Sequence, residues 1–263
     1  MFEDHSDFSV LRGFISIIGA VLLVSGILFC SVSGGSEASP SSHLQRPVSC
    51  PPVAPLKTSH VRKPLAFDRH AKYVALTFDD GPSTVYTHRI LAILEREHVP
   101  ATFFVLGSQA KRYSGIVKAE VAQGSQVANH SWNHKNMNMV KSKNIKKDLG
   151  NTRKVIRRVT GIDTRYVRLP YGSANKRVRK KVRSMKLIRI YWDKDPRDWS
   201  RPGVKKIIGR ATHGVKNGQI ILMHDGGGNR TQTVKALRRV IDKLKRRGFT
   251  FCTVDDLYRF DLK

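Results

Sequence analysis

The sequence predicts a parallel α/β fold, on two observations. From Lys72 onward, short apolar runs alternate with longer amphipathic stretches, and most of these runs are continuous rather than alternating apolar with polar. Continuous apolar runs are typical of parallel strands buried on both faces, and alternation of strands with helices favours a parallel sheet. Seven strands in about 190 residues suit a (β/α) barrel that falls short of eight complete units.

Each apolar run is expected to form one strand. In chain order the predicted strands are Tyr73–Phe78, Ala101–Leu106, Gln126–Asn129, Tyr166–Leu169, Leu187–Trp192, Gln219–His224 and Phe249–Val254. The helical period of the apolar residues predicts helices over 84–98, 144–160 and 233–245. Thr84 is expected to cap the first of these helices, and Gly161 to end the second.

Polar side chains follow five of the predicted strands at the point where each strand ends. The five clusters are 79–81, 129–130, 168–172, 193–199 and 224–225. A single Asp or His after a strand is usually a cap or turn residue, but five clusters form a joint pattern. The carboxyl ends of the strands form the active-site face of a (β/α) barrel, so the pattern indicates an enzyme.

His130 and His134 stand four residues apart in NHSWNH. If the chain turns helically from Ser131, both imidazoles face one side, which suits chelation of one metal ion. The pair alone is weak evidence, and the adjacent carboxylates Asp79 and Asp80 offer a further ligand. Neighbouring side chains on an extended chain point in opposite directions, so one can bind a metal while the other acts as a base. In isolation, Asp-Asp-Gly is more often a simple turn.

Five motifs, TFDDG, HSWNH, RLPYG, DPRDW and LMH, occur in this order. Together they resemble the five motifs of the polysaccharide deacetylases, the NodB-homology domain of carbohydrate esterase family 4, over about residues 70–263. The resemblance implies a distorted (β/α) barrel. It also implies metal-dependent removal of acetyl groups from N-acetylated sugars, with N-acetylglucosamine of peptidoglycan as the expected substrate. A related amide hydrolase with another substrate is the alternative enzyme.

The resemblance implies that Asp80, His130 and His134 hold one divalent metal ion, with zinc expected first and cobalt, manganese or nickel as alternatives. Asp79 resembles the general base, which takes a proton from the attacking water. Arg168 resembles the arginine that pairs with this base, and an arginine beside a carboxylate keeps it ionised and oriented.

His224, in LMH, resembles the general acid that protonates the leaving amine, a task that suits a histidine with a pKa near neutrality. Asp195, which opens DPRDW, resembles the partner that holds the imidazolium and raises its pKa. The backbone N–H of Tyr171 resembles a donor to the oxyanion.

Three further residues are expected to contact the substrate. Trp199 and Leu222 are expected to wall the pocket for the acetyl methyl group, and Pro170 to lie beside them. An ordinary core position is the alternative for Trp199.

The first 66 residues change composition twice. Residues 14–32 carry no charge and are long enough to span a bilayer as a helix. We expect a membrane anchor, with residues 1–13 in the cytoplasm and the remainder outside the cell; a cleaved signal that secretes the domain, or a buried helix, is the alternative. Residues 33–66, rich in Ser, Pro and Gly, are expected to form a flexible linker to a catalytic domain at 67–263.

The linker contains Cys50, and a disulfide with Cys252 is an option outside the cell. A small buried residue in a strand is the favoured interpretation of Cys252.

The chain carries 48 basic and 20 acidic residues, a net charge of +28, and the excess belongs to the predicted domain. Residues 1–66 contain five basic and four acidic groups, which leaves 43 and 16, or +27, for residues 67–263. Such a charge favours an anionic partner, here an anionic cell envelope or membrane surface. The basic stretch Asn175–Arg189 is expected to form a helix near the site. A nucleic-acid-binding protein is the alternative class, but no helix-turn-helix, zinc-finger or stacking-aromatic motif supports it.

Overall fold

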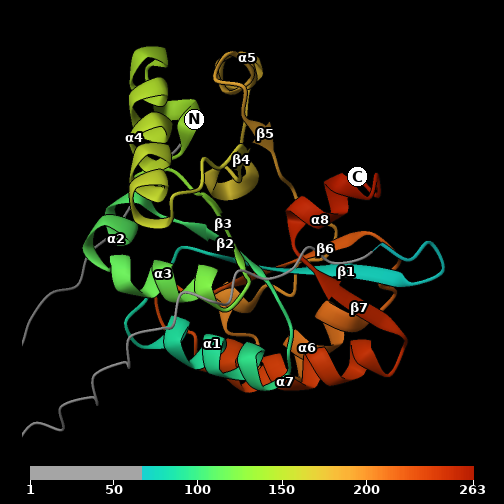
Figure 1. The fold of residues 1–263 in the computed structure, drawn as a ribbon. Helices are drawn as coiled ribbons and strands as arrows, with labels where there is room; N and C mark the ends of the chain where they lie inside the picture. The colour runs from blue at the N-terminus through green and yellow to red at the C-terminus, as the bar shows by residue number, and fades with distance from the viewer. Residues whose placement is uncertain (1–66) are drawn as a thin grey trace, which may run out of the picture. The chain divides into compact units, whose positions relative to one another are not determined.

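A seven-stranded sheet lies at the centre of the domain (Figure 1). The structure, a computed structural model, describes residues 67–263. Its strands are β1 (Lys72–Asp79), β2 (Thr102–Val105), β3 (Gln126–Asn129), β4 (Tyr166–Val167), β5 (Ile188–Arg189), β6 (Gln219–His224) and β7 (Phe249–Cys252). Every pairing between them is parallel, and each strand lies within or at a predicted run, so the predicted α/β class is confirmed.

The sheet curls toward a barrel. Hydrogen-bonded neighbours follow the order β5-β4-β3-β2-β1-β6, and β7 pairs with the first half of β1. The chain that follows β5 then reaches the opposite edge, because Lys194 forms a parallel bridge with Ile221 of β6. The backbone N–H groups of Asp193 and Lys194 also donate to the Ile220 carbonyl, at 2.9 and 3.1 Å. The result is a curled half-barrel, in agreement with the distorted barrel expected from the sequence.

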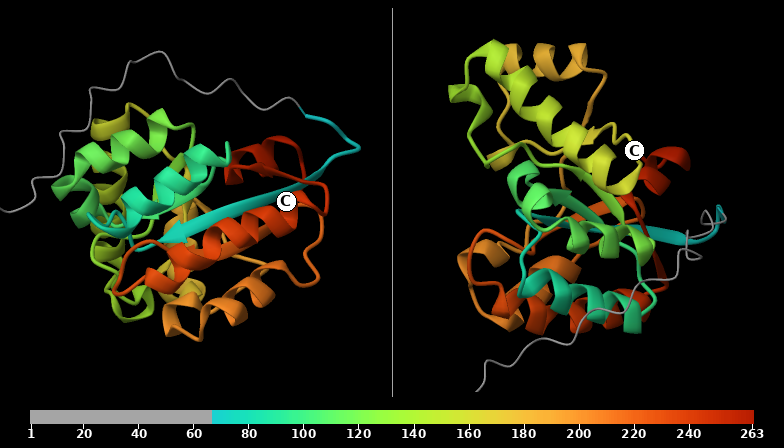
Figure 2. Two further views of the ribbon diagram at one scale, coloured as in Figure 1. Left: turned by 90° about the horizontal axis from the view of Figure 1, so that it is seen from below. Right: turned by 60° about the vertical axis from the view of Figure 1, so that its left-hand side comes forward.

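Helices surround this sheet (Figure 2). They are α1 (Tyr86–Arg96), α2 (Gly107–Arg112), α3 (Ser114–Ala122), α4 (Ser142–Thr160), α5 (Lys176–Ser184), α6 (Val204–Thr212), α7 (Thr231–Lys245) and α8 (Val254–Arg259). Three short 3₁₀ turns follow strand ends or loops: η1 (Met137–Met139), η2 (Pro170–Gly172) and η3 (Asp198–Ser200).

β1 shows why the apolar runs are continuous. Leu76 and Phe78 belong to the cluster formed with helices such as α1 and α7, whereas Tyr73 and Ala75 belong to the cluster on the other face. Alternate residues of one strand are therefore buried by different layers. A strand of this kind has no polar face that would reveal a period of two.

The predicted helices are present as α1, α4 and α7, with ends that differ from the predicted bounds by up to two residues. Gly161 ends α4 with a left-handed φ of 75°, as expected. The prediction that Thr84 caps α1 is wrong, because the Ser83 hydroxyl accepts hydrogen bonds from the N–H groups of Val85 and Tyr86. The basic stretch predicted as one helix over 175–189 is α5 followed by β5, since the helix ends at Ser184.

The predicted anchor at 14–32, the linker at 33–66 and Cys50 lie outside the described residues. Within residues 67–263, no helix is both long and apolar enough to cross a membrane. Cys252 is fully buried in β7, as expected.

Candidate active site

β1 ends in two adjacent carboxylates with different partners. Asp79 is 3% exposed, and its Oδ1 accepts a hydrogen bond from Arg168 Nη1 at 2.7 Å. Asp80 has a left-handed φ of 75°, and its Oδ1 lies 3.3 Å from His130 Nε2 and 3.2 Å from His134 Nε2. One carboxylate therefore faces an arginine and the other faces two imidazoles, which matches the predicted division of the pair.

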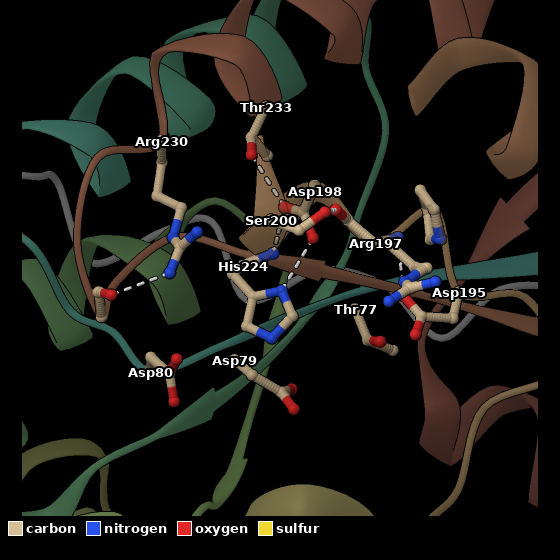
Figure 3. Close-up of polar contacts among 12 residues, drawn as sticks. Thr77, Asp79, Asp80, Asp195, Arg197, Asp198, Ser200, His224, Arg230 and Thr233 are labelled. Atoms are coloured by element: carbon tan, nitrogen blue, oxygen red, sulfur yellow. Dashed lines mark hydrogen bonds and ion pairs between the residues drawn. The ribbon is translucent and has the colours of Figure 1, made fainter. Parts of the chain in front are cut away.

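The glycines that follow β6 make room for the unusual backbone of Asp80. A Cβ atom on Gly226 would lie 2.1 Å from the Asp80 carbonyl oxygen, and one on Gly227 would lie 2.5 Å from Asp80 Oδ2. Arg230, which is 5% exposed, donates to the carbonyl oxygens of both glycines at 2.6 and 2.8 Å (Figure 3). A left-handed conformation costs a non-glycine residue about 1–3 kcal/mol, so the surroundings must hold it in place.

His130 and His134 come together without a helix. Residues 130–136 form an irregular loop, and both Ser131 and His134 have positive φ. The helical turn assumed from the four-residue spacing is therefore wrong, although the predicted pairing is present, with ring centroids 5.1 Å apart. Side-chain acceptors shape the loop instead, because Asn129 Oδ1 accepts from Ser131 N at 2.9 Å and Asp148 Oδ1 accepts from Trp132 N at 2.7 Å.

The donor set suits a divalent metal ion. One ligand atom from each of Asp80, His130 and His134 lies within 4.8 Å of the other two. Asp80 Oδ1 is buried and makes no hydrogen bond. His130 Nδ1 lies 2.8 Å from the carbonyl oxygen of Arg168, an arrangement that leaves Nε2 free to coordinate, as in metal-binding histidines. Catalytic zinc sites commonly have three protein ligands, and two imidazoles with one carboxylate provide such a set.

The pKa values of the three groups reflect their crowding. Burial raises the pKa of Asp80, but the nearby imidazoles outweigh it and the net pKa is lowered, so the carboxylate is ionised. Burial lowers the pKa of His134, and the net pKa is lowered, which favours the neutral, coordinating form. Burial also lowers the pKa of His130, but the charges of Asp79 and Asp80 raise it overall.

Arg168 is a fully buried cation that spans the barrel interior. Besides Asp79, its Nη1 donates to Thr77 Oγ1 at 2.7 Å, and its Nη2 donates to the Tyr191 carbonyl oxygen at 3.2 Å. The guanidinium also stacks over the Phe104 ring at 4.1 Å. Burial lowers the pKa of Arg168, yet arginine keeps its charge in proteins, and the Asp79 carboxylate compensates it.

His224 pairs with Asp198, and the prediction that Asp195 is its partner is wrong. His224 Nδ1 lies 2.8 Å from Asp198 Oδ1, and the His224 backbone N–H donates to Asp198 Oδ2 at 2.9 Å (Figure 3). Asp195 instead accepts from the backbone N–H of Arg197 at 2.7 Å. The left-handed backbone of Arg197 and the 3₁₀ turn η3 carry the second aspartate of DPRDW inward, where it is 1% exposed.

The pairing with Asp198 also sets the charge of His224. Burial lowers the pKa of His224, but the Asp198 carboxylate raises it, and the net pKa is raised. A raised pKa favours an imidazolium that can donate a proton from Nε2, since Nδ1 faces the carboxylate.

The four remaining predicted residues have different surroundings. Tyr171 is 67% exposed, with a φ of 61°, and its ring packs against the His134 ring in a T-shaped arrangement with 4.7 Å between the ring centroids. Trp199 is 46% exposed beside Asp198, which excludes an ordinary core position. Leu222 is buried two residues before His224 on the same side of β6, and Pro170 is buried at the start of η2. Pro170 is therefore less open to a substrate than Tyr171 or Trp199.

Asp225 is a buried acid that the motif analysis left without a role. Burial raises the pKa of Asp225 to about 7. Its Oδ2 accepts from Thr87 Oγ1 at 2.6 Å, and its backbone N–H donates to the Asp79 carbonyl oxygen at 3.1 Å. Asp225 thus connects the end of β6 with the end of β1 and with α1. The one feature of the sequence that pointed to Asp225 was its position directly after His224.

Comparison with known proteins indicates the same family as the sequence motifs. A family model described as "Polysaccharide deacetylase" matches residues 67–189. The peptidoglycan-N-acetylglucosamine deacetylase of Bacillus cereus is 35% identical over 191 residues, 72% of this chain and 89% of the relative. The chitooligosaccharide deacetylase of Sinorhizobium fredii is 38% identical over 190 residues, 68% of this chain and 88% of the relative.

A solved structure shares both fold and sequence. The family 4 carbohydrate esterase of Streptomyces lividans in complex with acetate matches with a TM-score of 0.65 and 32% identity, over 68% of this chain and 91% of that one. The curled parallel sheet, the Asp-His-His cluster and these relatives agree, and the chain belongs to the polysaccharide deacetylase family of carbohydrate esterases.

Proposed function

We propose that this protein hydrolyses the acetamide group of N-acetylglucosamine in peptidoglycan and releases acetate. The observation that carries the proposal is that three groups meet at the carboxyl ends of the strands: the Asp80, His130 and His134 cluster, the Asp79–Arg168 pair and the His224–Asp198 pair. The Bacillus cereus relative is named as a peptidoglycan-N-acetylglucosamine deacetylase, and the related Streptomyces lividans esterase structure holds acetate.

Asp80, His130 and His134 are the residues that would hold the metal ion, and zinc suits two imidazoles and one carboxylate. Bound there, a divalent ion supplies Lewis-acid chemistry, which helps amide hydrolysis near neutral pH. Cobalt, manganese and nickel accept similar ligands.

Asp79 is proposed as the general base. Its Oδ1 is held by Arg168, while Oδ2 lies 3.8 Å from His130 Nε2 and faces the site. Oδ2 can therefore accept a proton from an attacking water. The buried guanidinium fixes the orientation of Asp79 through this 2.7 Å contact.

His224 is proposed as the general acid. Asp198 holds the ring through Nδ1, so Nε2 carries the proton that the leaving amine needs. An amine leaves poorly unless it is protonated, and a positioned acid typically contributes about 10²- to 10⁴-fold to the rate.

The substrate is proposed to lie between η2 and η3. The Tyr171 backbone N–H is assigned to the developing oxyanion, and Leu222 and Trp199 to the acetyl methyl group. The exposed Tyr171 and Trp199 rings offer flat surfaces to sugar rings, whereas Pro170 is buried at the start of η2.

For the whole chain we propose a membrane anchor at 14–32 with the catalytic domain outside the cell, or a secreted domain if this segment is cleaved. The charge of +27 on residues 67–263 is proposed to hold the domain against the anionic envelope, where its substrate lies.

The test is acetate release from purified peptidoglycan and from N-acetylglucosamine oligomers, with and without a chelator. We expect release that stops on chelation and returns with zinc, and no release by Asp80→Ala. Release that persists after chelation would overturn the metal assignment. If acetate were released from the oligomers alone, the substrate would be a chitooligosaccharide and not peptidoglycan. The Sinorhizobium fredii relative is named as a chitooligosaccharide deacetylase.

A further inference from the structure

The basic charge of the domain is concentrated on two neighbouring helices. α4 carries seven Lys and Arg residues and one Asp, and α5 carries six basic residues and no acidic one. The helices lie at the same end of the domain (Figure 1) and share an apolar cluster that includes Leu149 of α4 and Val182 of α5. We call the solvent-exposed side of these two helices the α4–α5 face.

Most of these cations are not neutralised. Asp163 forms an ion pair with Arg153, and Asp148 is turned inward to accept from Trp132 N. Within the described part of the chain, ten basic side chains of the two helices have neither an ion pair nor a side-chain hydrogen bond. They are Lys143, Lys146, Lys147, Lys154, Arg157, Arg158, Lys176, Lys180, Lys181 and Arg183. Unpaired cations at this density attract an anionic partner.

The helix pair α6–α7 serves as a comparison for the charge of the α4–α5 face. It carries eight basic residues and one acidic residue, and Glu97 forms ion pairs with two of the basic ones, Arg238 and Lys245. This pair lies at the other end of the domain from α4 and α5 (Figure 1). The α4–α5 face therefore differs from an equally helical surface of the same domain, because it has more basic residues and a smaller share of them in ion pairs.

The α4–α5 face begins at the loops that form the site. The loop with His134 leads through η1 into α4, and the loop with Tyr171 leads into α5. The two starts are tied together, because Asn138 Oδ1 accepts from Asn175 N at 2.8 Å and Arg177 Nη2 donates to the Asn138 carbonyl oxygen at 2.8 Å. A long polymer that occupies the site can therefore continue across this face.

The chemistry of the face favours a hydrated polyanion over a bilayer. Helices that bind bilayers present aromatic or large aliphatic side chains to the lipid. The large exposed apolar side chains of residues 67–263 lie outside α4 and α5, and the apolar residues of α5, Val178 and Val182, are buried. The face also lacks the exposed aromatic rings that single-stranded nucleic acid uses for stacking.

We infer that the α4–α5 face is a second binding surface for the substrate polymer, which it engages through carboxylates on the peptide side chains of peptidoglycan. The inference rests on the proposed function, since it names peptidoglycan as the occupant. It assigns to α4 and α5 the retention of a polymer whose sugar is deacetylated at the site.

The test compares two sets of six charge-neutralising substitutions in the full-length chain. The α4–α5 set is K143Q, K147Q, K154Q, K176Q, K180Q and R183Q. The matched α6–α7 set is K205Q, K206Q, K235Q, R239Q, K243Q and R246Q. Both sets lower the net charge equally and use exposed side chains without partners, so they differ only in position.

Binding is measured by sedimentation with insoluble peptidoglycan freed of attached phosphate polymers, in the presence of chelator so that no turnover occurs. We expect the α4–α5 set to weaken binding by about tenfold or more, which corresponds to about 1.4 kcal/mol, and the α6–α7 set to change it by less than about twofold. Wild-type binding is expected to weaken with added salt. Acetate release from a short neutral N-acetylglucosamine oligomer, and the melting temperature, are expected to stay unchanged in both sets.

Equal losses in the two sets would overturn the inference, because net charge alone would then explain binding. Stronger wild-type binding to phosphatidylglycerol vesicles or to polynucleotide than to peptidoglycan would also overturn it. Loss of activity on the short oligomer in the α4–α5 set would show that the face supports the catalytic site instead. If wild-type protein binds peptidoglycan but releases no acetate from any glycan, the proposed function fails while the binding result stands.

Discussion

Replacement of Asp198 by Asn tests how the proposed general acid is held. The carboxylate accepts three hydrogen bonds: from His224 Nδ1 at 2.8 Å, from His224 N at 2.9 Å and from Thr233 Oγ1 at 2.7 Å. A hydrogen bond to a charged group contributes about 1.5–3 kcal/mol. If this contribution is lost in the transition state, kcat/KM should fall by about 10- to 150-fold. The side chain keeps its shape, so the fold is expected to persist.

The pH profile gives a second, more specific signal. Burial lowers the pKa of His224, and the carboxylates of Asp198, Asp79 and Asp80 raise it, so removal of the Asp198 charge lowers this pKa. An acid must be protonated to act, and the alkaline limb of kcat/KM should therefore move to lower pH in Asp198→Asn. The assay is acetate release from an N-acetylglucosamine oligomer across a pH series.

Asp195→Asn is the matched control, because the motif offers both aspartates and only the second reaches His224. Asp195 accepts from a backbone N–H and does not contact the imidazole, so kcat/KM should change by less than about twofold. A larger loss in Asp195→Asn than in Asp198→Asn would refute the assignment. So would an Asp198→Asn variant that loses activity and melting temperature together while its pH limb stays in place.

Three other predictions concern groups around the site. Gly227→Ala should weaken zinc binding, measured by titration, because its Cβ would lie 2.5 Å from Asp80 Oδ2; Gly228→Ala, also at positive φ but clear of Asp80, should not. Arg168→Met leaves Asp79 buried without its cation and should lower the free energy of unfolding in urea by about 3–5 kcal/mol. The pKa of Glu120 is raised by burial, and neither carboxylate oxygen has a hydrogen bond. Protonated Glu120 therefore contributes its full stability at acid pH, and this contribution is lost as the pH rises above 4.5. Urea unfolding between pH 4 and 8 should show a decrease in the free energy of unfolding that is smaller in Glu120→Gln.

The strands were accessible from sequence because both faces of this sheet are covered. A strand buried on two sides must be apolar at every position, and polar residues then mark where it ends. The same reasoning overestimated β4 and β5, which pair over only two residues each. After Val167 the side chain of Arg168 points into the barrel and contacts Asp79. Its position in a predicted strand does not reveal this contact.

The sequence could predict those residues of the site that lie at the ends of strands. Parallel strands bring their carboxyl ends to one edge, so Asp80, His130 and His224 could be expected to meet. The partner of His224 could not be chosen in the same way. Asp195 and Asp198 share one loop, and the choice between them depends on a left-handed residue and a 3₁₀ turn, neither of which has a pattern in the sequence.

The His130–His134 pair shows how a correct grouping can rest on a wrong cause. A spacing of four places two side chains together on a helix, but here the loop bends because Asn129 Oδ1 accepts from Ser131 N and the Ser131 hydroxyl accepts from His134 N. Asn129 Nδ2 in turn donates to the Leu149 carbonyl oxygen of α4 at 2.8 Å. The geometry of the imidazoles is therefore set by a buried amide outside the spacing motif. The same amide links the proposed metal ligands to α4, one of the two helices of the proposed polymer-binding face.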